Sequence, residues 1–190
     1  VTGAEVITGW VPHQGSICKA QVEFDFDQLF VDGQMMIEAR WPNTGFDLLH
    51  PTRAVAEGGA ENKSLVDSHL TQPDGFWNGA RLHMTPGAHW VSWTRPVKNF
   101  SQERHELSWD EPWSTDWAYI VQKGTFYYLS GILGALDAPG EWYLDRDTKT
   151  VYLWAPEGDH PSKHVVEAKK RALAFDLSER SYIEVTGFGI

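Results

Sequence analysis

Leu29-Phe30-Val31 and Gln34-Met35-Met36-Ile37 are two short apolar runs separated by Asp32-Gly33. An Asp-Gly pair suits the two central positions of a type I′ turn, both of which need positive φ. Residues 29–37 therefore predict a β-hairpin. Working outward from it, we expect the rest of the chain to consist of short strands joined by tight turns.

A second hairpin is predicted farther along the chain. Glu141-Trp142-Tyr143-Leu144-Asp145 and Thr150-Val151-Tyr152-Leu153-Trp154 flank the polar turn Arg146-Asp147-Thr148-Lys149. Apolar residues alternate with more polar or amphipathic neighbours in both runs, which is the pattern of a half-buried strand.

Other strands and two short helices are predicted from local patterns. The expected strands cover 4–10, 17–26, 80–84, 89–94, 119–121, 126–129, 164–168, 172–176 and 182–186, and short helices are considered at 62–70 and 130–136. Many short strands about ten residues apart favour an all-β sandwich or barrel. At 190 residues the chain is expected to form one domain with one substantial core.

Residues 44–118 form a long, Trp-rich region without sustained periodicity. Its glycines and prolines interrupt any regular pattern. A loop of this length in a compact domain is usually functional or packed over another domain. We therefore expect this irregular region to carry part of the function.

Charge and composition exclude several functional classes. The formal charge is -10, with 26 acidic and 16 basic residues, which argues against nucleic acid as a partner. It also disfavours strongly anionic polysaccharides, although a local basic pocket could override the global field. The single cysteine, Cys18, excludes an internal disulfide, and no apolar stretch approaches the length of a membrane span.

Three stretches together are similar to a known family. They are residues 28–43, which end in Glu38-Ala39-Arg40-Trp41-Pro42-Asn43, residues 136–154, which contain Pro139-Gly140-Glu141-Trp142-Tyr143, and residues 175–187. They resemble the insertion domain of glycoside hydrolase family 141, which interrupts a right-handed parallel β-helix of the pectate-lyase-like type.

The resemblance implies an arrangement of domains. Residues 1–10 would be a strand of the preceding β-helix coil, residues 11–180 a β-sandwich-like insertion domain, and residues 181–190 the return into the β-helix. The family's reactive acids would follow Ile190, so no catalytic residue is carried over to this chain. Both ends are strand-like and apolar, and we expect the protein to continue beyond them.

Two kinds of side chain are candidates for chemistry, carboxylates and histidines. Glu141 beside Trp142 is the best-placed acid for a raised pKa, but it is interpreted as capping a turn or pairing with Arg40. His83 and His89 flank a predicted turn and could face each other across a hairpin. No metal-ligand signature accompanies them, so neither a metal nor a cofactor is predicted.

The ten tryptophans are the outstanding compositional feature. Trp10, Trp41, Trp142 and Trp154 are predicted to be core residues. Trp90 and Trp93 are expected on one strand, pointing to opposite faces, whereas the tryptophans of the irregular region are expected to stay partly exposed. The candidate carbohydrate-binding residues are Trp77, Trp90, Trp93, Trp109, Trp113, Trp117, Arg81, Asp110 and Asp116, with Asn78, His83 and Arg95 as further polar groups.

These observations favour a non-catalytic accessory domain of a β-helix glycoside hydrolase or lyase, flanking the substrate groove and contacting a polysaccharide or oligosaccharide. Its other partner would be the rest of the parent chain, in an extracellular or periplasmic setting. The alternatives are an autonomous carbohydrate-binding module with a Trp platform and a purely structural domain. An independent hydrolase or lyase ranks last.

Overall fold

The computed structural model describes residues 3–60, 62–110, 119–173 and 175–187. Strands account for nearly all its regular structure, accompanied by the single 3-10 turns η2 (Leu133–Ala135) and η3 (Pro161–Lys163). The predicted all-β fold is confirmed. Within these ranges, no helix has the length and apolar content required to cross a bilayer.

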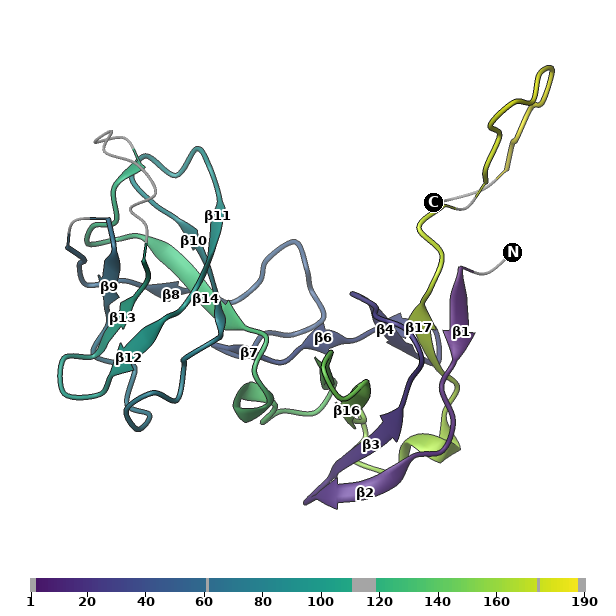
Figure 1. Cartoon of the computed structure of the whole chain (residues 1–190), viewed down its shortest axis with the longest axis horizontal. Helices are drawn as coiled ribbons and strands as arrows, with labels where there is room; N and C mark the ends of the chain where they lie inside the picture. Colours follow the sequence, from purple (N-terminus) through teal and green to yellow (C-terminus); the bar gives the residue numbers. More distant parts are fainter. Residues whose placement is uncertain (1–2, 61, 111–118, 174, 188–190) are drawn as a thin grey trace.

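Two sheets build the first lobe, which contains the first and the last strand of the described chain (Figure 1). One sheet has the order β1 (Ala4–Val6), β17 (Val166–Lys169), β4 (Leu29–Val31), β5 (Gln34–Met35). The other has the order β2 (Val11–Gln14), β3 (Ile17–Gln21), β16 (Thr150–Trp154), β15 (Glu141–Asp145), β6 (Ile37–Glu38).

Two further sheets build the second lobe, seen on the left of Figure 1. The larger has the order β11 (Trp93–Pro96), β10 (Arg81–Thr85), β14 (Phe126–Ser130), β7 (Arg40–Trp41), and β8 (Ala54–Val55) also pairs with β14. The smaller has the order β12 (Asn99–Ser101), β13 (Glu106–Ser108), β9 (Ser64–Val66).

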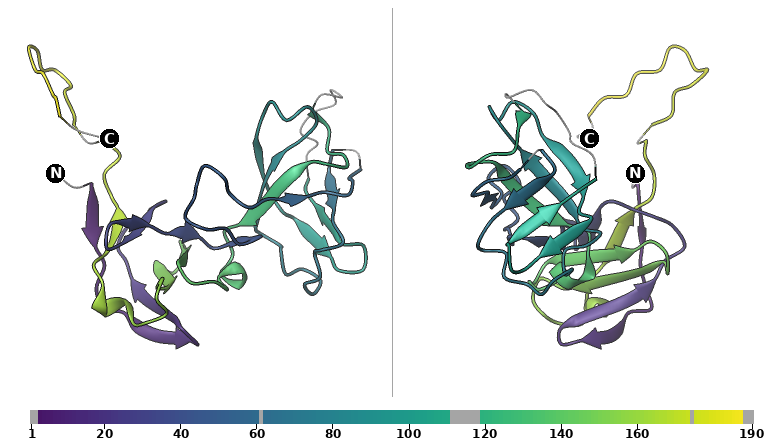
Figure 2. Two further views of the ribbon diagram at one scale, coloured as in Figure 1. Left: turned by 180° about the vertical axis from the view of Figure 1, so that it is seen from behind. Right: turned by 60° about the vertical axis from the view of Figure 1, so that its left-hand side comes forward.

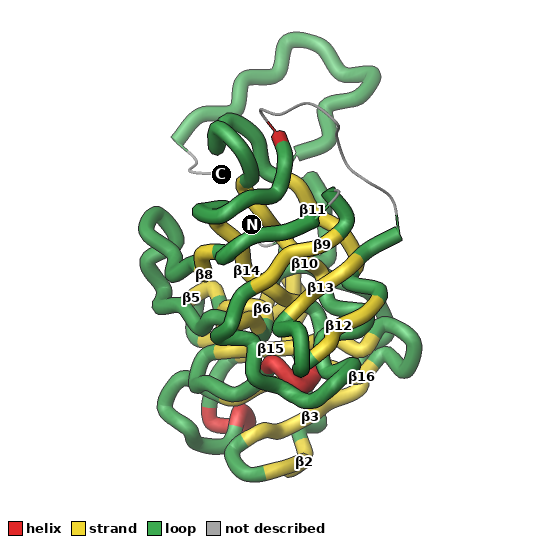
Figure 3. Tube along the Cα trace, turned by 90° about the vertical axis from the view of Figure 1, so that its left-hand side faces the viewer, coloured by secondary structure: helices red, strands yellow, loops and turns green. Residues whose placement is uncertain are grey.

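The buried residues form two clusters, so the prediction of one core is wrong. The first-lobe cluster includes Leu29 and Val151, and the second-lobe cluster includes Leu82 and Phe100. Each cluster lies mainly among the strands of its own lobe. Figure 3 views the chain along its long axis, with the second-lobe strands β9, β12 and β13 above the first-lobe strands β2 and β3. The β15–β16 hairpin touches both clusters, since Trp142 belongs to the first and Tyr143 packs against the second. Because successive side chains of a strand point to opposite faces, the sheet that contains β15 and β16 can pack against both cores.

Both predicted hairpins are confirmed. Asp32 and Gly33 have φ values of 50° and 81°, and they join β4 to β5 as a type I′ turn requires. In the second hairpin, β15 pairs with β16 from Trp142↔Leu153 to Asp145↔Thr150.

The helix considered at 62–70 is wrong, because residues 64–66 form β9 and pair with β13. The pairing buries Leu65 completely, and this long-range packing outweighs local helix propensity. The short helix considered at 130–136 is confirmed as the single turn η2.

Residues 44–118 are not the irregular region that their sequence predicted. They contain β8 to β13 within the described ranges, in strands of two to five residues. Such short strands carry too few alternating positions to stand out as a periodic pattern. Residues 22–26 continue beyond β3 outside any strand, although Val22 and Phe26 are buried as predicted.

Several other expected strands are shorter than predicted or absent. β1 ends at Val6 and β11 begins only at Trp93, while no strand forms in the described parts of 172–176 and 182–186. A strand needs a neighbour to satisfy its backbone groups. β1 has one, because it pairs antiparallel with β17, so the segments that flank the domain lie side by side (Figure 2).

Candidate functional site

The outer face of the β10–β14 pair is the most promising surface for ligand contact. Alternate residues of both strands point into the second-lobe core, among them Leu82 and Leu129. The residues between them are only partly buried or point away from the core. We call this set the β10–β14 face; it comprises Arg81, His83, Thr85, Phe126, Tyr128 and Ser130.

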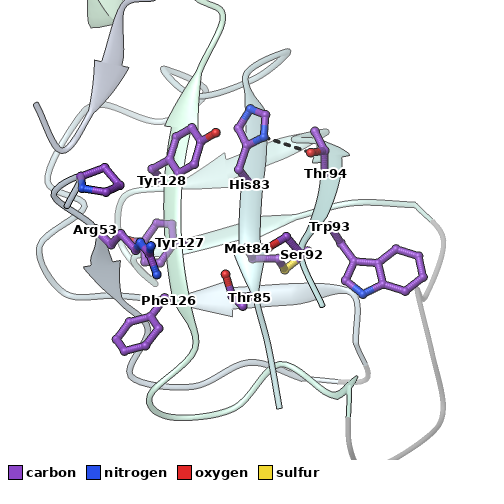
Figure 4. A pocket seen from close by; sticks show the side chains of 11 residues that line it. Arg53, His83, Met84, Thr85, Ser92, Trp93, Thr94, Phe126, Tyr127 and Tyr128 are labelled. Carbon is purple, nitrogen blue, oxygen red and sulfur yellow. Dashed lines mark hydrogen bonds between the residues drawn. The ribbon is translucent and has the colours of Figure 1, made fainter. Parts of the chain in front are cut away.

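Two flat rings lie parallel at the centre of the β10–β14 face. His83 and Tyr128 are register partners, with ring centroids 4.3 Å apart and planes inclined by 9°. His83 Nδ1 lies 2.9 Å from Thr94 Oγ1 and Nε2 lies 3.1 Å from Ser130 Oγ (Figure 4). Hydrogen bonds at both ring nitrogens hold the imidazole plane in place.

Burial, followed by the nearby Arg81 charge, lowers the pKa of His83 to about 4. The imidazole is therefore neutral at neutral pH. A neutral ring stacks on a phenol without carrying a charge of its own into the site.

Three arginines gather around Tyr128. The Arg40 guanidinium lies 4.0 Å from the Tyr128 ring centroid and donates to the Pro42 and Thr52 carbonyls over 3.1 and 2.6 Å. Arg53 lies 5.9 Å from the Phe126 ring centroid. Arg81 forms an ion pair with Glu38.

A pocket of about 300 Å³ opens on this face. Figure 4 shows Arg53 between Tyr128 and Phe126, with His83 and Thr85 on the neighbouring strand. A second pocket of about 270 Å³ shares His83 and Tyr128 with the first. The first pocket is lined by Pro51, Arg53, His83, Met84, Thr85, Ser92, Trp93, Thr94, Phe126, Tyr127 and Tyr128.

Trp90 and Trp93 lie close to this pocket, but not as predicted. Trp93 begins β11 and lines the pocket, whereas Trp90 lies in the loop before β11 and is 74% exposed. Their expected placement on one strand is therefore wrong. The predicted facing pair of His83 and His89 is also wrong, because His89 belongs to the same loop and its ring lies 4.6 Å from that of Phe126.

Trp77 and Trp109 were expected to be partly exposed, and that prediction is wrong. Their exposed fractions are 1% and 4%, and both belong to the second-lobe core. Trp77 Nε1 donates to Gln72 Oε1 over 3.0 Å, and Trp109 Nε1 donates to a backbone carbonyl. With their polar edges satisfied, large rings are stable inside a core.

The remaining candidates fall in different places. Arg81 belongs to the β10–β14 face, while Asp110 is exposed away from the pocket and forms an ion pair with Lys98. Trp113, Trp117 and Asp116 lie outside the described residues. Trp10 and Trp142 are buried in the first-lobe core as predicted, whereas Trp41 and Trp154 are only partly buried and pack against the second-lobe core.

Comparison with known proteins decides the family. A family model described as the GH141 insertion domain matches residues 8–156. The chain belongs to the GH141 insertion domain family. The resemblance inferred from the three sequence stretches is thereby confirmed at the level of this domain.

One solved structure resembles this GH141 insertion domain in fold. A protein titled "Glycoside hydrolase" gives a TM-score of 0.60 and 21% sequence identity, covering 87% of this chain and 31% of that chain. The chain thus spans less than a third of that protein. None of the curated proteins compared matches the chain.

Glu141 of the GH141 insertion domain caps a turn, as the sequence predicted. Its Oε2 accepts hydrogen bonds from the backbone amides of Asp137 and Ala138 over 3.2 and 3.3 Å. Only 2% of the residue is exposed, and burial raises the pKa of its carboxyl to about 7. The acid caps the turn that leads into β15.

Glu57, Asp67 and His69 bring three possible metal ligands within 4.8 Å of one another. All three side chains already have protein partners. Asp67 Oδ1 lies 2.8 Å from His69 Nδ1, and Ser68 Oγ donates to Glu57 over 2.6 Å. This geometry identifies a hydrogen-bonded cluster that stabilises the second lobe.

Sequence reasoning missed Arg53, Phe126 and Tyr128. Only tryptophans were expected to act as sugar platforms, although residues 126–129 were predicted to be an extended strand and do form part of β14. The signal was available, because a strand with two aromatic rings on the side opposite Tyr127 and Leu129 must place them on its outer face. Nothing in the sequence indicated that Arg53 reaches the same face.

Proposed function

We propose that this GH141 insertion domain is a non-catalytic accessory domain of a glycoside hydrolase. Its β10–β14 face would contact the carbohydrate chain beside the parent's substrate groove. The observation that carries this proposal is the parallel stack of His83 on Tyr128, which lines an open pocket.

The chemistry of the pocket suits a sugar. Pyranose rings have apolar C–H faces that pack on aromatic rings, and polar edges that need hydrogen-bond partners. His83 and Arg40 cover the two faces of the Tyr128 ring, so Phe126, Trp93 and the edge of Tyr128 supply the aromatic surface. Thr85, Ser92 and Thr94 supply hydroxyls around it. Pre-positioned groups of both kinds reduce the entropy lost on binding.

The rest of the parent is proposed to lie beyond β1 and β17. Their side-by-side pairing suits a segment inserted into a larger fold. Apolar side chains after β17 are exposed and would pack on the adjoining coils, which we propose to be a parallel β-helix. They are Leu173, Leu177, Tyr182, Ile183 and Val185. An extracellular or periplasmic location is part of the same proposal.

Titration calorimetry of the chain with neutral and acidic plant and algal oligosaccharides tests sugar contact. We expect at least one oligosaccharide to bind and Tyr128→Ala to weaken its binding about tenfold, the equivalent of roughly 1.4 kcal/mol of lost ring contact. Tyr152→Ala, which removes a ring outside the pocket, is the matched control and should bind as the unmodified chain does. Circular dichroism of each variant establishes that it is folded.

The same titration separates the alternatives. Loss of binding in Trp90→Ala with no effect of Tyr128→Ala would favour an autonomous module that binds through its exposed tryptophan. Absence of binding to every sugar in the panel would contradict the proposal and leave a purely structural role.

A further inference from the structure

The first pocket of the β10–β14 face has a positive local charge, opposite in sign to the net charge of the protein. The chain carries a formal charge of -10, yet Arg53 lines this pocket, and among the described residues no Asp or Glu lines it. Arg40 and Arg81 also lie close enough to Tyr128 to act on its hydroxyl electrostatically. Of these three arginines, Arg81 is paired with a carboxylate, that of Glu38.

Arg40 is a buried cation whose hydrogen-bond and ring partners are neutral, and the carboxyl of Glu141 is the acidic group close enough to act on its charge electrostatically. Only 8% of the residue is exposed, and its contacts are two backbone carbonyls and the Tyr128 ring. In the part of the chain that is described, no carboxylate lies within 4.0 Å of its guanidinium nitrogens. Removing a charge from water is costly unless an opposite charge compensates it. Arg40 thus maintains a positive potential behind Tyr128.

Arg53 lies on the pocket side of Tyr128 and adds a second positive charge there. It is exposed, it lines the first pocket, and it lies between the rings of Tyr128 and Phe126 (Figure 4). A guanidinium presents two parallel N–H groups that match the paired oxygens of a carboxylate or sulfate. The residue is thus placed to bind a charged substituent while the rings contact the sugar face.

We propose that the carbohydrate bound on the β10–β14 face is anionic, with Arg53 pairing with a carboxylate or sulfate group on the sugar. This inference rests on the proposed carbohydrate contact and names the class of sugar involved. It reverses the expectation that the acidic net charge disfavours anionic polysaccharides. A local site overrides the global field because salt screens charges beyond about 8 Å at physiological ionic strength.

Two paired probes test the proposal by titration calorimetry of the chain. The first pair is tetragalacturonate and its fully methyl-esterified form, which share a backbone and differ in charge. The second pair is a sulfated galactan tetrasaccharide and its desulfated form. We expect one charged form to bind about tenfold or more tighter than its neutral partner, because hydrogen bonds to charged groups are the stronger kind.

Arg53→Gln should bring the affinity for the charged form down to that for the neutral form and leave the neutral form unaffected. Arg104→Gln makes the same charge change on an exposed residue that does not line the pocket, and it should alter neither affinity. Both side chains are exposed, so both variants should fold. Raising the salt concentration should weaken only the charged interaction.

Each outcome has a distinct meaning. A preference for tetragalacturonate identifies a carboxylate as the ligand group, and a preference for the sulfated probe identifies a sulfate. Equal binding of charged and neutral forms overturns the inference but leaves the proposed sugar contact intact. A charge preference that survives Arg53→Gln overturns the assignment of Arg53. Absence of binding by all four probes overturns the inference, while neutral sugars of other backbones continue to test the proposed function.

Discussion

Tyr127 donates its hydroxyl hydrogen to Asp67 Oδ2 over 2.7 Å, and each residue is only 1% exposed. Burial, followed by this hydrogen bond, raises the pKa of Tyr127 far above its usual value. The pair links β14 to the residue that follows β9, across two different sheets of the second lobe.

Tyr127→Phe is expected to lower the free energy of unfolding by about 2 kcal/mol, because it leaves a buried carboxylate oxygen without its donor. Urea denaturation followed by tryptophan fluorescence measures the change. Adding Asp67→Asn in the same chain should recover part of the loss, since a neutral amide is less costly to bury. If the two substitutions simply add, the hydrogen bond contributes nothing specific.

His164 lies between two carboxylates, with Nδ1 2.6 Å from Asp32 Oδ2 and Nε2 2.6 Å from Asp159 Oδ1. Hydrogen bonds to Asp159 and then to Asp32 raise the pKa of His164 above 6.5. The stabilisation by the imidazolium is complete below pH 6.5 and is lost as the pH rises through the raised value. The same contacts lower the pKa of both aspartates, so their contribution is lost as the pH falls below 3.8.

We therefore expect His164→Gln to reduce the melting temperature at pH 5.5 more than at pH 8.5. Differential scanning fluorimetry at both pH values measures the two differences. His13→Gln serves as the control, since in the described chain its side chain contacts a tyrosine ring rather than a carboxylate. A loss that is equal at the two pH values would show that His164 acts only by packing.

Glu141 should make the protein less stable as the pH rises. Its carboxyl has a pKa of about 7 in the folded state against 4.5 for the unperturbed group, so the folded state holds the proton more tightly. The stability falls by roughly 2–3 kcal/mol between pH 4.5 and pH 8 as the buried group ionises. Glu141→Gln should abolish that fall, whereas the exposed Glu157→Gln should retain it. Denaturant titrations across this pH range compare the two variants.

His83 should act in the opposite pH direction. The pKa of this residue is about 4 in the folded state and 6.5 in the unperturbed group, so the unfolded state binds the proton more readily between these values. Stability from the neutral ring is complete above pH 6.5 and declines by about 2 kcal/mol as the pH falls to 4. In His83→Gln the midpoint of denaturation should change less with pH over this range. An unchanged slope would mean that the ring is protonated in the folded protein.

The sequence predicted the elements whose information is local. Asp32-Gly33 specifies its turn through backbone conformation, and the alternating residues of 141–154 specify both strands of the second hairpin. The motif around Glu141 identified both the turn that it caps and the family of the domain.

The sequence did not predict elements that depend on distant partners. β9 has only three residues, and its strand conformation comes from pairing with residues 106–108. Trp77 and Trp109 occur among polar neighbours, yet the fold supplies acceptors for both indole N–H groups and buries them. Arg53 joins Tyr128 in the candidate site only because β8 and β10 both pair with β14.

The pairing of β1 with β17 allows the domain to be inserted into another protein. Ala4 lies opposite Lys169 in the register, and paired residues of antiparallel strands have Cα atoms about 5 Å apart. A surface turn of an unrelated protein has stems with similar spacing, so residues 4–169 could be transplanted into such a turn without stretching the host. The same geometry would allow a short linker to replace the whole segment in its native setting.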